Sequence, residues 1–402
     1  MCGIIGYTGT REVAPILLDG LATLEYRGYD SAGIAVIAPS GQVTVRKAAG
    51  KLNNLILSMN GALPKGMTGI GHTRWATHGE PNQANAHPHQ DCRGEVVVVH
   101  NGIVENFLEL KRELVDQGHI FTSQTDSEVI PHLMESFLGQ GLSIEEAARR
   151  TALKLVGSHA VVAMCQGEPD KLLAFKVGSA GGIAVGYGDG EMVVASDLLA
   201  ILPHTRRVAF LSAGEMASVT PTSFTAISLA DGSPVEKTPQ VMDYDPVSVA
   251  KGRYPHFMLK EIAEQAEATM ATMRGRVSFE PADVSLEDFP LTDSDIQGID
   301  RVIFTAMGTS FHAALIARHM MERLSGIPSQ AENASEFRYS DPILDSRTLV
   351  VSVGQSGETA DTLAAMDEAA RKGARLLTVC NVEGSQAARM AEGCIYLRAG
   401  PE

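Results

Sequence analysis

Short apolar runs separated by turns rich in Gly, Asn and Asp dominate the chain from Gly3 to about Val241. Runs of roughly four to eight β-branched and apolar residues between such turns are typical of strands. They lie at 33–37, 95–99, 160–164, 192–195 and 215–219. Apolar positions with helical spacing interrupt them at 13–25, 106–117, 126–138 and 143–155. The mixture predicts an α+β layered sandwich of mostly antiparallel strands for this part of the chain.

The pattern changes after a polar, turn-prone segment, and we place a linker over 242–256. A helix is expected at 257–273, followed by an acidic stretch at 280–300. From Arg301 onward, strand and helix patterns alternate: strands at 301–306, 348–353, 375–380 and 394–398, helices at 311–324 and 359–372. Alternation with short Gly-bearing loops predicts a parallel sheet covered by helices. We therefore expect two domains of different fold class, 1–241 and 257–402.

Composition narrows the class of protein. The formal net charge is −15 and no Lys/Arg-rich block occurs, which disfavours nucleic acid or an anionic membrane as a partner. The five cysteines are scattered, without a C-x-x-C pair, which fits a reducing compartment. The sequence shows neither an apolar run of transmembrane length nor a charged and then apolar leader. We expect a soluble cytoplasmic protein.

The second residue is a cysteine, and cytosolic processing normally removes Met1 when a small residue follows. Cys2 would then carry both a thiol and a free α-amine, whose pKa of about 7.7–8.0 lets it take the thiol proton near neutral pH. One residue would thus supply nucleophile and base. The alternative is that Cys2 merely begins a strand.

Two further stretches carry candidate chemistry. In the first, at 71–79, an Arg fork could bind a carboxylate and Trp75 could cover a ligand; the alternative is a surface Arg with a half-buried Trp. In the second, Asn101 and Gly102 follow a Val-rich strand at what we expect to be a sharp turn. Their side-chain amide and backbone N–H could converge as an oxyanion hole, although an ordinary Asn-Gly turn is the commoner structure.

The segment 125–128 matches a capping box, with Thr125 as the N-cap and Glu128 three residues on. Asp126, expected to be exposed in the first turn, could pair with a ligand ammonium group. Histidines between His72 and His100, including His87 and His89, invite a metal hypothesis. We favour a role in supporting loops, because their spacing places them on successive loops without a thiolate pair, and we predict no metal and no cofactor.

Together these stretches resemble the glutaminase domain of the glucosamine-6-phosphate synthase family, the glutamine-fructose-6-phosphate aminotransferases. The resemblance rests on MCGIIG at 1–6, LEYRGYDSAG at 24–33, RW at 74–75, NAHPH at 85–89 and HNGIVEN at 100–106. It implies an N-terminal-nucleophile (Ntn) hydrolase sandwich. It also implies Cys2 as the nucleophile with its amine as base, and Asn101 and Gly102 as the oxyanion hole.

The same resemblance assigns the glutamine pocket. Arg74 would bind the carboxylate of glutamine and Asp126 its α-ammonium group, with Thr77 and His78 completing the pocket. Trp75 would gate the release of ammonia. A further catalytic-site residue, Arg27, would order the region near the nucleophile.

Two loops in the second half share one design: a strand, small hydroxyl-bearing residues, then a helix. Small residues, hydroxyls and a helix N-terminus suit a phosphate, although Ser and Thr are also ordinary N-caps. Both loops, at 307–310 and 354–359, resemble the first sugar isomerase (SIS) domain of the same family, a flavodoxin-like α/β fold. The resemblance implies that a sugar phosphate is bound by Thr309, Ser310, Gln355, Ser356 and Thr359. The sequence departs from the family pattern at Gly354, commonly serine, and at Met307, commonly cysteine.

The resemblance implies an amidotransferase that releases ammonia from glutamine and transfers it to fructose 6-phosphate, giving glucosamine 6-phosphate, in a homodimer. Family members continue into a second sugar isomerase domain, so we expect a truncated chain that supports glutaminase activity and phosphosugar binding alone. Two alternatives stay open: another ketose phosphate as acceptor, with Gly354 adapting the loop, or a non-catalytic phosphosugar sensor.

Overall fold

The computed structural model describes residues 2–178, 181–242, 254–286, 289 and 291–400. The chain divides into two compact units, Met1–Tyr244 and Asp245–Glu402, and each is described by itself. The linker expected over 242–256 falls mostly on 243–253, which lie outside the described residues.

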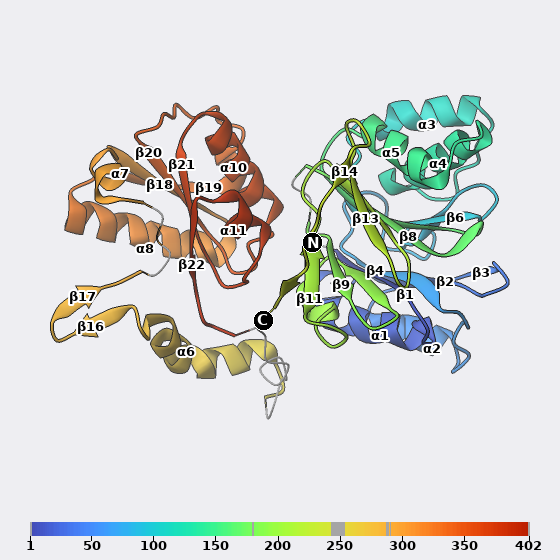
Figure 1. The fold of residues 1–402 in the computed structure, drawn as a ribbon, viewed down its shortest axis with the longest axis horizontal. Coiled ribbons are helices and arrows are strands. Elements are labelled where there is room, and N and C mark those ends of the chain that lie inside the picture. The colour runs from blue at the N-terminus through green and yellow to red at the C-terminus, as the bar shows by residue number, and fades with distance from the viewer. Residues whose placement is uncertain (1, 179–180, 243–253, 287–288, 290, 401–402) are drawn as a thin grey trace. The chain divides into compact units, whose positions relative to one another are not determined.

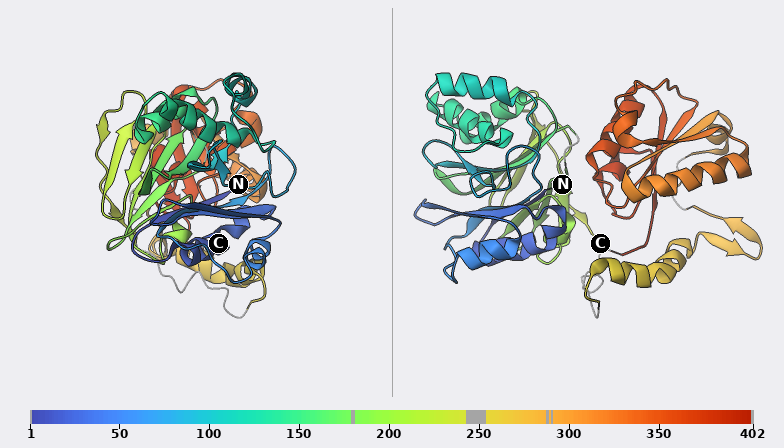
Figure 2. Two further views of the ribbon diagram at one scale, coloured as in Figure 1. Left: turned by 90° about the vertical axis from the view of Figure 1, so that its right-hand side faces the viewer. Right: turned by 180° about the vertical axis from the view of Figure 1, so that it is seen from behind.

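The first unit contains two stacked antiparallel sheets (Figures 1 and 2). The eight strands of one sheet are, in spatial order, β15 (Gln240–Val241), β11 (Arg207–Phe210), β9 (Ala184–Tyr187), β10 (Met192–Ala195), β1 (Gly3–Thr8), β4 (Thr68–Arg74), β2 (Ser31–Ile37) and β3 (Val43–Ala49). The seven strands of the other are β14 (Pro234–Val235), β13 (Phe224–Ser228), β12 (Glu215–Val219), β8 (Glu168–Val177), β7 (His159–Cys165), β6 (Val96–Gly102) and β5 (His89–Gln90).

Helices cover the outer face of each sheet. The eight-stranded sheet packs on α1 (Val13–Leu24) and α2 (Leu52–Ser58), and the seven-stranded sheet on α3 (Phe107–Asp116), α4 (Val129–Gly139) and α5 (Ile144–Lys154). Alternate strand positions face the neighbouring sheet, where Ile4 and Ile70 meet Val99 and Val162 in a third apolar cluster. The predicted sandwich of mostly antiparallel strands is therefore confirmed, with the order helix, sheet, sheet, helix.

Short helical turns and one hairpin complete the elements outside the sheets and main helices. The turns are η1 (Glu25–Arg27), η2 (Asp126–Glu128) and η3 (Leu198–Ala200). The second unit begins with α6 (Phe257–Met273), the hairpin β16 (Val277–Phe279) and β17 (Ala282–Val284), and α7 (Asp293–Gln297).

A five-stranded parallel sheet forms the centre of the second unit. Its spatial order is β19 (Ser329–Asn333), β18 (Arg301–Ala306), β20 (Thr348–Val353), β21 (Arg375–Cys380) and β22 (Gly393–Tyr396). One face packs on α8 (Gly308–Ser325), the other on α9 (Ala334–Phe337), α10 (Ala360–Arg371) and α11 (Gln386–Met390). The chain leaves β18 toward β19 and returns on the other side as β20, so a topological switch point lies between β18 and β20.

Sequence periodicity missed β19, α9 and α11, and placed the start of α8 three residues late. β19 is polar (SQAEN) and only its first residue is buried, so it carries no apolar run. The short helices α9 and α11 have too few turns to show a period. Within the described residues no helix has the length and apolar character needed to cross a membrane.

Candidate active site and phosphate-binding loops

Cys2 lies directly before β1, beside the end of β4, because Gly3 pairs with Thr73 in the sheet. The backbone N–H of Trp75 donates a hydrogen bond to Cys2 Sγ over 3.2 Å. Burial raises the pKa of the Cys2 thiol, although the N–H of Trp75 opposes that shift. A thiol held neutral in this way needs a base to become a nucleophile. Met1 lies outside the described residues.

Asn101 points its side-chain amide at Cys2. Its Nδ2 donates to the backbone carbonyl oxygen of Cys2 over 3.0 Å. The expected sharp turn is wrong: Asn101 and Gly102 are the last two residues of β6 and pair with β7. Gly102 has φ +140°, and a Cβ there would lie 2.2 Å from the carbonyl oxygen of Ser158, so only glycine fits.

His72 fixes the orientation of this amide. Its Nε2 lies 3.1 Å from both Asn101 Oδ1 and the carbonyl oxygen of His100. Burial lowers the pKa of His72 to about 3, so the ring is neutral, and because both partners are acceptors its proton must sit on Nε2. With Oδ1 held by His72, Asn101 Nδ2 faces Cys2. The sequence motifs pointed to loop support for the histidines from His72 onward and not to this positioning of Asn101.

Arg74 ends β4 and is buried, so the alternative of a surface Arg is wrong. Its Nη2 donates to the carbonyl oxygens of His78 and Gly79. Its Nη1 is buried without a hydrogen-bond partner among the described residues. A buried guanidinium N–H left without an acceptor is costly, and a ligand carboxylate is the acceptor that a guanidinium fork binds best.

The loop after Arg74 carries the other expected pocket residues. Trp75 is 49% exposed and its ring meets the ring of Tyr29 edge-on, with centroids 5.4 Å apart. Thr77 is exposed on the same loop. His78 Nδ1 lies 3.9 Å from Asp126 Oδ1, so the loop brings His78 close to Asp126.

Two expectations for the segment 125–128 are wrong. Asp126 is buried rather than exposed, and its Oδ2 accepts a hydrogen bond of 2.7 Å from the N–H of Val104. Thr125 precedes η2 without capping it, and Glu128 instead accepts from Thr122 and Ser123. Burial raises the pKa of Asp126. A buried carboxylate is costly unless an opposite charge lies beside it, and the His78 ring is 3.9 Å away from one of its oxygens. An ammonium group of a ligand would therefore suit Asp126.

Arg27 is buried and contacts Ser196 and Asp197, which connect it to β1. Its Nη1 donates to Asp197 Oδ2 over 2.8 Å and to the carbonyl oxygen of Ser196 over 3.2 Å. Ser196 Oγ in turn accepts from the N–H of Ile4 in β1. The Asp30 carboxylate accepts a hydrogen bond from the N–H of Ala76 and so anchors the loop that carries Trp75.

The histidines between 72 and 100 do not lie on successive loops. His72 and His100 are in strands, and the ring of His87 lies against the rings of His72 and His89, with centroids 4.2 and 4.5 Å apart. These four histidines are buried, and burial lowers the pKa of His87 and His89. Within the described residues, the one convergent group of metal-ligating atoms lies elsewhere, at Cys92, His119, His132 and Glu135.

In the second unit, the register brings the two hydroxyl-bearing loops together. Ala306 at the end of β18 pairs with Val353 at the end of β20, so both loops leave the same edge of the sheet. Thr309 and Ser310 lie in the first turn of α8, and Thr359 is the N-cap residue of α10. Two helix N-termini with hydroxyls at a switch point have a geometry that suits an anion.

The remaining loop residues lie between β20 and α10. Ser356 Oγ accepts from the N–H of Glu358 over 3.2 Å, and the carbonyl oxygen of Gln355 accepts from the N–H of Asn381 over 2.9 Å. Gly357 has φ +63° and no room for a Cβ, which would lie 2.3 Å from Ser385 Oγ. Gly354 is different, since a Cβ there would meet only the Gly357 nitrogen at 3.9 Å.

This fold and these sites define an amidotransferase unit followed by a sugar-isomerase-like unit. A family model described as "Glutamine amidotransferase domain" matches residues 72–203, and one described as "SIS domain" matches 295–402. The chain is 49% identical over 405 residues to a glutamine--fructose-6-phosphate aminotransferase [isomerizing] of Symbiobacterium thermophilum and 45% identical over 403 residues to that of Pyrococcus horikoshii. The chain belongs to this aminotransferase family.

Each of these two matches takes in 100% of this chain and 65% of the relative, so the chain spans about 65% of the length of these relatives. Among solved structures, the glutamine phosphoribosylpyrophosphate amidotransferase of Bacillus subtilis has a TM-score of 0.52 at 19% identity. That match covers 94% of this chain and 81% of the other. At this identity the likeness concerns the fold alone.

Proposed function

We propose that the first unit hydrolyses glutamine to glutamate and ammonia. One observation carries the proposal: the thiol of Cys2, the amide of Asn101, the buried unpartnered Nη1 of Arg74 and the buried carboxylate of Asp126 are linked by a continuous series of contacts. Trp75 joins Cys2 to Arg74, Arg74 bonds to His78, and His78 approaches Asp126. A carboxylate anchor, an ammonium anchor and a nucleophile are the groups that glutamine requires.

The chemistry follows from these groups. Once Met1 is removed, the α-amine of Cys2 takes the thiol proton and the thiolate attacks the side-chain amide carbon of glutamine. The oxyanion that forms is stabilised by Asn101 Nδ2, whose second hydrogen is available, and by the N–H of Gly102. The intermediate collapses, and ammonia leaves with the proton held by the α-ammonium group. The amine then activates a water that hydrolyses the thioester, giving glutamate and restoring the thiol.

Arg74 and Asp126 bind the α-carboxylate and α-ammonium groups, which places the amide at Cys2. His78 and Thr77 complete the pocket, and Trp75 covers it from the exposed side. Arg27 orders the start of β1 through Ser196, whose hydroxyl holds the N–H of Ile4.

For the second unit we propose binding of a sugar phosphate by Thr309, Ser310, Gln355, Ser356 and Thr359. The relatives' names point to fructose 6-phosphate, and the complete protein would transfer ammonia to it to give glucosamine 6-phosphate. The cytoplasm as its location and a homodimer as its assembly are further proposals. The first rests on cysteine usage, the second on the family resemblance alone. Size-exclusion chromatography with light scattering tests the dimer.

Glutamate release by the purified chain tests the glutaminase proposal. The wild-type chain and Cys165→Ala, a matched control outside the pocket, are expected to release glutamate from glutamine. Cys2→Ala should release none above the uncatalysed rate, because nucleophile and thioester are lost together. Retained activity in Cys2→Ala would exclude the assigned role. Mass spectrometry of the intact chain should show that Met1 is absent.

A further inference from the structure

Four side chains from three separate segments converge outside the proposed glutamine pocket. Cys92 lies in the loop between β5 and β6, His119 follows α3, and His132 and Glu135 are three residues apart on α4. The i, i+3 spacing places the last two on one face of the helix. The ligand atoms of all four lie within 4.8 Å of one another.

Four of the distances between the ligand atoms are close to the edges of a tetrahedral site, and a fifth, between Glu135 and His119, is shorter. Cys92 Sγ is 3.7 Å from His119 Nδ1 and 3.5 Å from His132 Nδ1, and the two Nδ1 atoms are 3.3 Å apart. Glu135 Oε2 is 2.9 Å from His119 Nδ1 and 3.4 Å from His132 Nδ1. Zinc at its usual bond lengths of about 2.0–2.3 Å requires edges of about 3.3–3.6 Å in a tetrahedral site.

Hydrogen bonds among the four side chains cannot satisfy all of their lone pairs. Glu135 accepts only, and the two imidazole Nδ1 atoms face each other at 3.3 Å, so they cannot both carry a hydrogen without opposing N–H groups. A cation at the centre satisfies the four lone pairs at once. With Cys92 as thiolate and Glu135 ionised, a divalent cation leaves the site neutral, which lowers the cost of its partial burial.

The surroundings support ligand roles. The N–H of Ile120 donates to Cys92 Sγ over 3.3 Å, and the N–H of Cys92 donates to Glu135 Oε2 over 3.2 Å. The other ring nitrogen of His132 is buried and makes no hydrogen bond among the described residues; a carboxylate oxygen of Glu128, 3.9 Å away, is the nearest charged group to it that the structure gives. Asp91 accepts from the N–H groups of Glu95 and Val96, which holds the Cys92 turn rigid.

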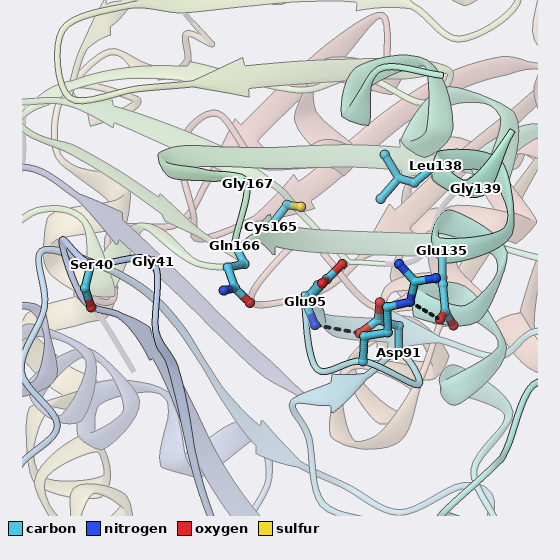
Figure 3. Close-up of a pocket in the computed structure, with 11 residues that line it drawn as sticks. Ser40, Gly41, Asp91, Glu95, Glu135, Leu138, Gly139, Cys165, Gln166 and Gly167 are labelled. Carbon is cyan, nitrogen blue, oxygen red and sulfur yellow. Dashed lines mark hydrogen bonds and ion pairs between the residues drawn. The ribbon is translucent and has the colours of Figure 1, made fainter. Parts of the chain in front are cut away.

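A pocket of about 570 Å³ lies beside one of the four residues, Glu135, and Figure 3 shows Asp91, Glu95 and Glu135 along its wall. Three carboxylates attract cations into it. Arg93, also in the wall, lies 3.9 Å from Glu135 Oε1, the oxygen that does not face the imidazoles.

We propose that Cys92, His119, His132 and Glu135 bind one Zn²⁺ ion as a structural site. Thiolate and imidazole ligands select Zn²⁺ over Mg²⁺ and Ca²⁺, which prefer oxygen. Four protein ligands leave no open position, as in sites that hold segments together rather than catalyse. The ion ties the β5–β6 loop and the segment after α3 to α4. Because η2 leads directly into α4, the ion also steadies the segment that carries Asp126.

Metal content of the full chain tests the proposal. The chain is stripped with a chelator, reloaded with Zn²⁺, desalted and measured by elemental mass spectrometry. Wild type and the control Cys165→Ser should bind one Zn²⁺ per chain. Cys92→Ser, at an exposed position, and the isosteric Glu135→Gln should bind it at least about 10- to 100-fold more weakly, the loss that follows removal even of an outer partner of a metal ligand.

A second measurement compares the Co²⁺-loaded wild-type chain with Cys92→Ser. Co²⁺ in place of Zn²⁺ should give intense tetrahedral d–d absorption and a thiolate-to-metal charge-transfer band, both lost in Cys92→Ser. Wild-type chain that binds no Zn²⁺ after reloading would overturn the proposal. So would equal binding by wild type and Cys92→Ser, or an octahedral Co²⁺ spectrum without the charge-transfer band.

Discussion

Replacing His72 by Phe should slow glutamine hydrolysis by acting through Asn101. Phe keeps a ring against His87, whose ring centroid lies 4.2 Å away, but removes the Nε2–H that holds Asn101 Oδ1 at 3.1 Å. Asn101 then loses its fixed orientation and spends part of its time with Oδ1 toward Cys2. The Asn101 amide is still present in this variant, but its Nδ2 donor points toward the oxyanion for only part of the time.

The magnitude follows from the lost hydrogen bond to Asn101, since the contact of the same nitrogen with the carbonyl oxygen of His100 does not orient the amide. A net neutral hydrogen bond contributes about 0.5–1.5 kcal/mol, so kcat should fall about 2- to 12-fold. Removal of the donor itself, in Asn101→Ala, should cost about 10²- to 10³-fold. KM for glutamine should change little in either variant, because Arg74 and Asp126 are untouched. His72→Gln, whose Nε2 takes the place of the imidazole Nε2, should restore most of the rate.

The assay is steady-state glutamate release by the wild-type chain, the three single variants and the double variant His72→Phe, Asn101→Ala. If His72 acts through Asn101, the double variant should be no slower than Asn101→Ala alone. Fully additive losses, or a failure of His72→Gln to recover activity when both chains fold equally by circular dichroism, would refute the positioning role. Because the pKa of His72 is lowered to about 3, the ring stays neutral between about pH 6 and 9. The ratio of the wild-type rate to the His72→Phe rate should therefore not vary over this range.

Three further predictions concern the two proposed sites. Arg74→Lys should raise KM for glutamine by about tenfold or more with a smaller change in kcat, because an ammonium cannot make the paired contacts of a guanidinium; an unchanged KM contradicts the carboxylate role. Burial raises the pKa of Asp126, so in the inactive Cys2→Ala background glutamine affinity should weaken on acidification at a higher pH than an ordinary Asp carboxylate would give, and calorimetry should find this slope absent in Asp126→Asn. Gly354→Ser should tighten sugar phosphate binding by about tenfold, since the site has room for a Cβ and a hydroxyl adds a charge-assisted bond; calorimetry with fructose 6-phosphate showing weaker binding would contradict this.

Much of the fold was predictable because the spacing of apolar residues along the chain reflects which faces of the strands and helices are buried. The strand at 160–164 and the helix at 143–155 stand out, since one is buried on both faces of a sheet and the other on one side only. β19 was not predictable, because a polar edge strand looks like a loop. The capping box predicted at 125–128 does not form for a different reason. The residue types match the motif, but the Glu128 carboxylate accepts hydrogen bonds from the N–H groups of Thr122 and Ser123 instead.

The proposed catalytic residues could be named because they cluster in short motifs, whereas their partners could not. Asp197, which holds Arg27, lies 170 positions away, and no local pattern connects the two. The four converging metal-ligating side chains were missed likewise: Cys92, His119 and His132 come from separate segments, and the spacings resemble no zinc motif. Long-range pairs of this kind appear only when the sheets are assembled.

The central claim is that Cys2, as the mature first residue, attacks the side-chain amide of glutamine. A glutamine analogue with an electrophilic carbon in place of the amide, followed by peptide mass spectrometry, tests it most directly. The account predicts a single label on Cys2 in a chain lacking Met1, suppressed by excess glutamine and by Asp126→Asn. A label on the exposed Cys92 with Cys2 unmodified, or labelling of Cys2 that glutamine does not suppress, would contradict it.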